Sequence, residues 1–85
     1  MPIRLTVSTP DGDAFDGEVD HFVVPAAEGS MAVFPRHAPI VALLKPGDAA
    51  FHVGGDRRIW ELGEGVLEVR RDGALIVVSS ARCVQ

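Results

Sequence analysis

Glycine and proline interrupt this chain so often that a long helix has no room to form. Between Pro2 and Gly73, no stretch free of both residues exceeds seven residues, whereas a helix that is recognisable by its period needs about 10–12. The segment Ile3–Thr9 instead alternates apolar and polar side chains, which is typical of a strand with one buried face. We therefore expect short strands joined by tight turns.

The rest of the chain repeats this pattern. Further strands are expected at residues 17–24, 31–34, 40–44, 49–53, 58–62, 66–70 and 74–79, with turns at "PDGD", "GGD", "GEG" and "RDG". The segment 74–79 is apolar on both faces, so we expect it to be central and covered on both sides. Strands of this number and spacing indicate an antiparallel sandwich or barrel, an all-β fold.

Size and charge limit the classes of function. With 85 residues, residues 1–85 are expected to form one domain with a folded surface of roughly 4,900 Å². Residues 11–28 hold six acids and no base, which argues against a nucleic-acid groove on that side. No apolar run reaches the ~18 residues of a membrane span, and the start of the chain lacks a signal-peptide pattern. We expect a protein that faces the cytoplasm without inserting into lipid.

Residues capable of chemistry are scattered. The three histidines, His21, His37 and His52, lie sixteen and fifteen residues apart, which is not the short spacing of a helical or turn-based metal pair. No serine lies in a nucleophile-elbow context, and the acids of residues 11–28 resemble no calcium loop. The single cysteine, Cys83, is expected to be an inert thiol, and we expect no cofactor and no catalytic residue.

The lack of a reaction centre directs attention to residues 28–47, "EGSMAVFPRHAPIVALLKPG". This segment mixes apolar and charged side chains around His37, as a protein contact does with its apolar centre and polar rim. Pro35 and Pro39 fix φ and remove backbone donors on either side of the histidine. A rigid loop of this kind loses little entropy when a partner docks.

The same segment resembles the signature of the epsilon subunit of F-type ATP synthases, which typically reads EG, an apolar pair, PGHAP, and LKPG or IKPG. Two more blocks fit in the same order. The block "TPDGDAFDGEVDHFVVPAAEG" is similar to the family's first hairpin, and "ELGEGVLEVRRDGALIVVSSA" is similar to its late strands. The resemblance covers nearly the whole chain.

The resemblance implies a ten-stranded β-sandwich that catalyses nothing itself. It implies a rotor subunit of the central stalk in a proton-translocating enzyme at the bacterial inner membrane, joining the gamma subunit to the c-ring. The residues expected to contact gamma are Thr9, Arg36, His37, Ala38, Pro39 and Ala42. Those expected to contact the c-ring are Glu28, Gly29, Ser30 and Met31, where Glu28 would suit basic side chains of the c-subunit loops.

The sequence departs from the family pattern in three places. Ala32 and Arg36 stand where glycines are usual, and "GEG" at residues 63–65 replaces a small-residue turn. Members of the family typically continue into two helices that restrain ATP hydrolysis and, in some members, bind ATP. Because the given sequence stops at Gln85, we expect no inhibitory arm and no ATP site of that type.

Two other readings stay open at this point. The chain could be a free-standing β-sandwich that binds a small ligand, although it has one tryptophan, Trp60, and no tyrosine to line a cleft. It could also be a small metalloenzyme that uses its histidines. Trp60 shares the apparent inner face of its strand with Leu62, so we expect it to lie in the core.

Overall fold

The structure, a computed structural model, describes residues 2–85, and they form strands and turns with no helix. The ten strands are β1 (Ile3–Thr9), β2 (Gly12–Val19), β3 (His21–Ala26), β4 (Gly29–Val33), β5 (Ile40–Leu44), β6 (Gly47–Val53), β7 (Asp56–Leu62), β8 (Gly65–Arg70), β9 (Gly73–Val78) and β10 (Ala81–Cys83). The expected ten-stranded all-β sandwich is confirmed. The accessible surface of 5052 Å² agrees with the expectation from chain length.

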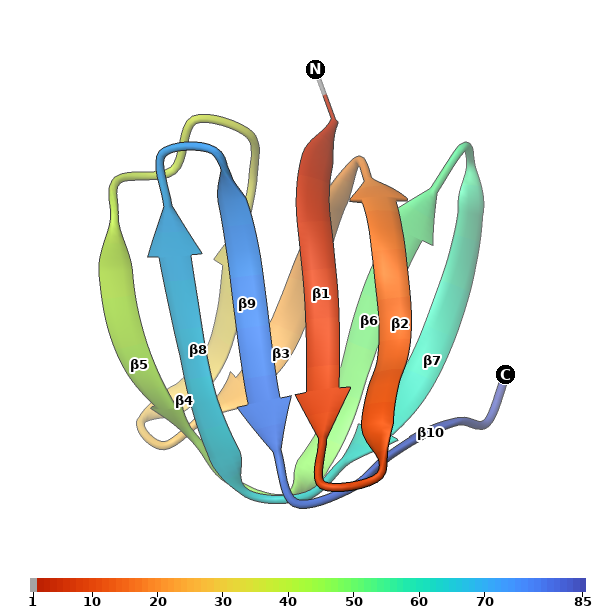
Figure 1. The fold of residues 1–85 in the computed structure, drawn as a ribbon. Coiled ribbons are helices and arrows are strands. Elements are labelled where there is room, and N and C mark those ends of the chain that lie inside the picture. The colour runs from red at the N-terminus through yellow and green to blue at the C-terminus, as the bar shows by residue number, and fades with distance from the viewer. Residues whose placement is uncertain (1) are drawn as a thin grey trace.

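The strands form one hydrogen-bonded sheet that folds into two layers (Figure 1). The layer nearer the viewer runs β5-β8-β9-β1-β2, and the layer behind it holds β4, β3, β6 and β7. The layers are joined where the end of β5 meets the end of β3, at the pair Leu44 and Ala26. All strand pairs are antiparallel except β1 with β9, which is parallel.

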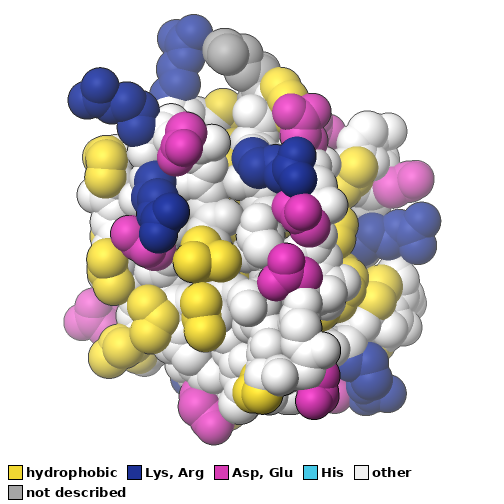
Figure 2. Space-filling model, viewed as in Figure 1, with side chains coloured by type: hydrophobic (Ala, Val, Ile, Leu, Met, Phe, Trp, Pro, Cys, Tyr) yellow, Lys and Arg dark blue, Asp and Glu magenta, His cyan; other side chains and the backbone are white. Residues whose placement is uncertain are grey.

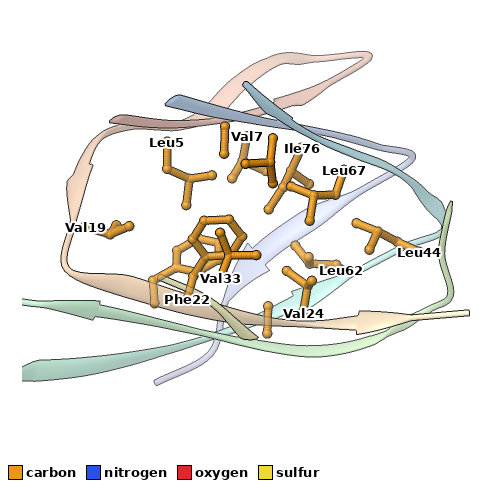
Figure 3. Packing of buried hydrophobic residues seen from close by; sticks show 14 of the residues in the cluster. Leu5, Val7, Val19, Phe22, Val24, Val33, Leu44, Leu62, Leu67 and Ile76 are labelled. Atoms are coloured by element: carbon orange, nitrogen blue, oxygen red, sulfur yellow. The ribbon is translucent and has the colours of Figure 1, made fainter. Parts of the chain in front are cut away.

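Side chains that point inward from both layers form one apolar core (Figure 3). Phe22 and Phe51 are its largest fully buried members, and Leu5, Leu67 and Ile76 surround them. Trp60 packs against this core with its ring centroid 5.6 Å from that of Phe51, as its place beside Leu62 predicted. The strands run from end to end of the sandwich, so the turns gather at its two ends (Figure 1).

Two expectations about strands were wrong. Residues 17–24 do not form one strand, because the chain turns a corner at Asp20 between β2 and β3. At this corner the backbone N–H of Asp20 donates to the carbonyl of His52 at 2.7 Å. The side-chain carboxylate of Asp20 also accepts a hydrogen bond from the Gly54 N–H at 2.9 Å. These hydrogen bonds to β6 and to the turn after it therefore fix the corner between β2 and β3.

The second correction concerns β9. The strand is central, between β8 and β1, but only its inner face is covered. Val77 on the outer face is 49% exposed. Its apolar outer side chains therefore belong to the surface of the molecule.

Candidate functional site

The proline-framed loop, residues 34–39, joins β4 to β5 at one end of the sandwich (Figure 1). The backbone N–H of His37 donates to the carbonyl of Phe34 at 3.2 Å, which closes a tight turn. The His37 ring nitrogen Nδ1 lies 2.8 Å from the Ala38 carbonyl oxygen, so this nitrogen carries the proton of the hydrogen bond. In a neutral imidazole with this tautomer, the remaining ring nitrogen, Nε2, is an acceptor.

Arg36 has a backbone φ of +67°, in the left-handed region that suits glycine. Arg36 thus stands, in this conformation, where the family pattern typically has a glycine. A left-handed residue with a Cβ carries about 1–2 kcal/mol of strain. Arg36 thus keeps a side chain where a glycine would fit with less strain.

A stack of three rings lies behind this loop. Phe34 is 55% exposed and stacks on His21, with ring centroids 4.8 Å apart. His21 stacks in turn on His52 of the neighbouring strand at 4.0 Å. The stack connects the loop to the outer face of β3 and β6, which restricts the movement of the loop.

A hollow of about 360 Å³ opens beside the proline-framed loop, and we call it the basic hollow. Its lining includes the arginines Arg4, Arg36, Arg70 and Arg71, together with His37 and the acid Asp72. Val33 and Val69, both buried, contribute to its apolar part. Some of the arginine side chains of the molecule project along the upper rim in Figure 2.

Two of these arginines are paired on the front layer. Arg4 Nη2 lies 2.8 Å from an oxygen of Asp16, and Arg70 Nη2 lies 2.9 Å from an oxygen of Glu68. The hydrogen bond from Arg70 lowers the pKa of Glu68 and raises that of Arg70. Both pairs are largely exposed, so each contributes little to stability and can be exchanged for another partner.

The opposite end of the sandwich carries the β1–β2, β3–β4, β5–β6 and β7–β8 turns, and we call it the acidic end. These turns hold the acids Asp11, Glu28 and Glu64 and the single base Lys45. Glu28 and Ser30 are exposed, whereas Met31 is half buried and packs against the core. Gly29 has a φ of +134°, which the turn between β3 and β4 requires.

A shallow groove of about 400 Å³ runs between β4 and β5, which do not pair with each other. One of its walls carries Glu28, Gly29, Ser30 and Met31, and the other carries Ile40, Val41, Ala42 and Leu43. The groove thus brings Ala42, from the residues expected to contact gamma, beside the residues expected to contact the c-ring. The sequence did not indicate this closeness.

Thr9 lies apart from the other residues expected to contact gamma. It ends β1, at the acidic end, whereas residues 36–39 lie at the end that holds the basic hollow. Its hydroxyl donates to the Gly12 carbonyl at 2.9 Å and accepts from the Asp11 N–H at 3.1 Å. The Thr9 side chain therefore closes the first hairpin, and a partner that touches both Thr9 and His37 must extend along the sandwich.

The sequence reasoning missed an apolar patch on the outer face of the front layer. It consists of Val41 and Leu43 on β5, Val66 on β8 and Val77 on β9, with exposed fractions from 36% to 68%. Yellow side chains gather at the lower left of Figure 2, over these strands, while acids and an arginine lie over β1 and β2. The available signal was the two-sided apolar pattern of residues 74–79.

Among the histidines, His21 and His52 meet and His37 lies in the loop. Partial burial lowers the pKa of His52, the charges of His21 and Arg57 lower it further, and Asp20 opposes them. Among residues 2–85, no group of three or more His, Cys, Asp or Glu side chains is placed to hold a metal ion. In the same part of the chain, no helix is long and apolar enough to cross a membrane.

Comparisons with known proteins agree on one family. Residues 2–83 match the family described as "ATP synthase, Delta/Epsilon chain, beta-sandwich domain". The ATP synthase epsilon chain of Alkalihalophilus pseudofirmus is 38% identical over 79 residues, which cover 93% of this chain and 59% of that protein. The ATP synthase epsilon chain of Rhodopseudomonas palustris is 39% identical over 77 residues, covering 89% of this chain and 56% of that protein.

Solved structures show the same fold. A chain of the mitochondrial ATP synthase of Euglena gracilis, solved with OSCP, F1 and the c-ring, matches with a TM-score of 0.90 and 24% identity. The match covers 96% of this chain and 53% of that one. A chain from the central stalk and c-ring of the Tetrahymena thermophila enzyme matches with a TM-score of 0.79 and 18% identity.

Proposed function

Since the chain belongs to the ATP synthase delta/epsilon β-sandwich family, we propose that it is a non-catalytic rotor component that joins the gamma subunit to the c-ring. The proposal assigns the basic hollow and the proline-framed loop to gamma. It assigns the acidic end to the c-ring. In this position the protein transmits torque and carries no catalytic residue.

The observation that carries the proposal is that residues 36–39 lie at one end of the sandwich, whereas Glu28 and Gly29 lie at the opposite end. The molecule measures 28 × 25 × 24 Å along its principal axes. A body of this size with a contact at each end fits between two partners.

Surface area supports the same reading. Two contacts of standard size, about 800 Å² each, would cover roughly a third of the 5052 Å² surface. The exposed apolar patch of Val41, Leu43, Val66 and Val77 is available to extend either contact along the front layer. Solvent-exposed patches of this kind commonly mark protein interfaces.

The electrostatics of the acidic end suit the proposed neighbour. Glu28 is exposed in its turn, and a basic side chain on a c-subunit loop would complement it. Ser30 is also exposed and is the second residue of β4, directly after this turn. We assign both residues, with Gly29 and Met31, to the c-ring contact, and we place the protein on the cytoplasmic side of a bacterial inner membrane in a proton-translocating enzyme.

The gamma contact is proposed to include Arg36, His37, Ala38 and Pro39, with Ala42 reached through the groove beside β5. Thr9 joins this contact only if gamma extends along the sandwich to the first hairpin. His37 is suited to its part because its free nitrogen, Nε2, can accept a hydrogen bond from gamma. The two prolines limit the entropy lost on docking.

The test is reconstitution. The matched ATP synthase, depleted of its own epsilon subunit and placed in vesicles, is assayed for ATP-driven proton transport with and without this protein. Restored transport, together with one-to-one binding to isolated gamma, is the expected result. Binding to neither gamma nor the c-ring would contradict the proposal, and the search for a small ligand of a free-standing sandwich would follow.

A further inference from the structure

We propose that the basic hollow is a receptor for acidic side chains, so that the surface it binds on its partner carries a cluster of Asp or Glu residues beside an apolar one. The inference rests on the proposed function, because it describes the chemistry of the gamma contact. It goes further by naming what the partner must present.

The charge of the lining is the first argument. Four arginines, Arg4, Arg36, Arg70 and Arg71, line the hollow, and Asp72 is the one acid among the lining residues. They come from β1, the proline-framed loop and the β8–β9 hairpin, three segments that are distant in sequence. This concentration of positive charge contrasts with a chain whose net charge is −4.

The arginines of the hollow can each pair with a separate carboxylate of a partner. Arg4 and Arg70 already hold Asp16 and Glu68 on the exposed front layer. Such surface pairs have a median value of only about 0–1 kcal/mol, so a partner carboxylate can replace them at little cost. Guanidinium groups engaged at different points of the rim suit spaced carboxylates better than one compact phosphate, which needs donors that converge.

The volume and the apolar lining of the hollow suit one side chain of a protein partner better than a separate small ligand. At about 360 Å³ it is close to the lower limit of about 300 Å³ for ligand pockets. Its apolar lining includes Ile3, Pro35 and Phe34, of which Phe34 is 55% exposed. An apolar side chain flanked by acids would fill the floor and pair with the rim.

The backbone of Arg36 gives an independent argument. The residue is held at a φ of +67°, where glycine is favoured and an arginine is strained. Backbone strain in a folded protein tends to gather at functional sites. Arg36 lines the basic hollow in this strained conformation, so the strain lies where the proposal puts the binding site.

The experiment measures binding of the matched gamma subunit by calorimetry and the melting temperature of each variant. Arg36→Gly should weaken binding about fivefold to tenfold, because it removes the charge from the rim of the hollow. Arg71→Glu should weaken binding at least about tenfold. Raising the salt from about 0.05 M to about 0.5 M should weaken wild-type binding, because salt screens the rim.

The matched control is Arg58→Glu, which makes the same charge change on β7 at a residue that does not line the hollow. It should change binding by less than about twofold. The inference would be overturned if Arg36→Gly and Arg71→Glu bound gamma as the wild type does.

A short poly-glutamate peptide separates this inference from the proposed function. Salt-sensitive binding of the peptide that Arg71→Glu abolishes, combined with no binding of gamma, would support the acid receptor and contradict the rotor proposal. Tight gamma binding, with no binding of the peptide and no effect of either arginine variant, would support the rotor proposal and overturn the inference of an acid receptor. Stoichiometric binding of inorganic pyrophosphate in place of the peptide would also overturn the inference.

Discussion

The two ends of this sandwich are built from the same strands, yet they differ in charge and in the contacts that support their loops. One end carries the proline-framed loop and the arginines of the basic hollow, and the other carries tight turns with Asp11, Glu28 and Glu64. At the first end a stack of three rings supports the loop from behind. One small core can therefore present two chemically distinct surfaces, because the difference lies in the turns and in the exposed side chains near the ends of the strands, such as Arg4 and Arg70.

The largest expected effect is a loss of folding stability, which should weaken the contacts at both ends. Gly65, at the start of β8, has no room for a side chain, because a Cβ would overlap the carbonyl oxygen of Val77 on the paired strand. Gly65→Ala should lower the free energy of unfolding by about 2–3 kcal/mol. Denaturant unfolding measures this change. Val66→Ala on the same strand, at a 36% exposed residue, should change it by less than about 0.5 kcal/mol.

Since both contacts depend on one core, Gly65→Ala should weaken binding of gamma and of the c-ring in parallel at temperatures near its melting point. If only one contact weakened there, the two ends would have to fold independently. That result would break the comparison.

The next largest effect should separate the ends. His37→Ala removes the imidazole and its Nε2 acceptor from the proline-framed loop, and binding of gamma should weaken about tenfold, or about 1.4 kcal/mol. Glu28→Lys reverses the charge of the acidic turn and should weaken sedimentation with the purified c-ring instead. Each variant serves as the control for the other, because both side chains lie outside the core. Loss of both contacts in either variant would contradict the assignment of one partner to each end.

Disruption of the ring stack should have a smaller effect on stability and on gamma binding. Phe34→Ala removes the ring that lies 4.8 Å from His21, so the loop should lose part of its order. The expected cost is about 0.5–1 kcal/mol in unfolding and a weakening of gamma binding of about threefold to fivefold. Calorimetry measures the binding and thermal melting measures the stability. Val53→Ala, at a 37% exposed residue beside His52, is the control and should bind normally.

Much of the fold could be predicted from the sequence because glycine and proline act locally. The turns "PDGD", "GGD", "GEG" and "RDG" all join consecutive strands in the structure. The corner at Asp20 could not be predicted in this way, because Gly54, thirty-four residues away, holds it. The short strand β10 was also missed, since three residues carry no recognisable period.

The exposure of the outer face of β9 could not be predicted, for a different reason. An apolar side chain that is covered and one that is exposed on an interface have the same sequence pattern, so Val77 was expected to be buried. The same holds for the basic hollow. Arg4, Arg36 and Arg71 approach one another only through the pairing of β1 with β9 and the position of the loop. The loop itself was recognisable from sequence, but its arginine neighbours were not.

The smallest predicted effect is a dependence of stability on pH at the end with the ring stack. The pKa of His52 is lowered in the fold by partial burial and by the charges of His21 and Arg57, against the effect of Asp20. The unfolded chain therefore binds more protons near its own pKa of about 6.5, and stability falls as the pH drops below that value.

Thermal melting from about pH 7.5 to about pH 5.5 measures this dependence. His52→Gln should flatten the curve over this range. The stabilisation linked to Glu68, whose pKa is also lowered, is lost at lower pH, below about 4.5, and stays separate. An unchanged slope in His52→Gln would show that the stack does not couple to protonation.

The most direct measurement of the two-ended account is photo-crosslinking in the assembled enzyme. On a Cys83→Ser background, His37→Cys and Glu28→Cys variants carry a benzophenone label, and the crosslinked subunits are identified by mass spectrometry. The account predicts that the label at residue 37 reaches gamma and the label at residue 28 reaches a c subunit. Labels at both residues that reach the same subunit, or a reversed pattern, would contradict it.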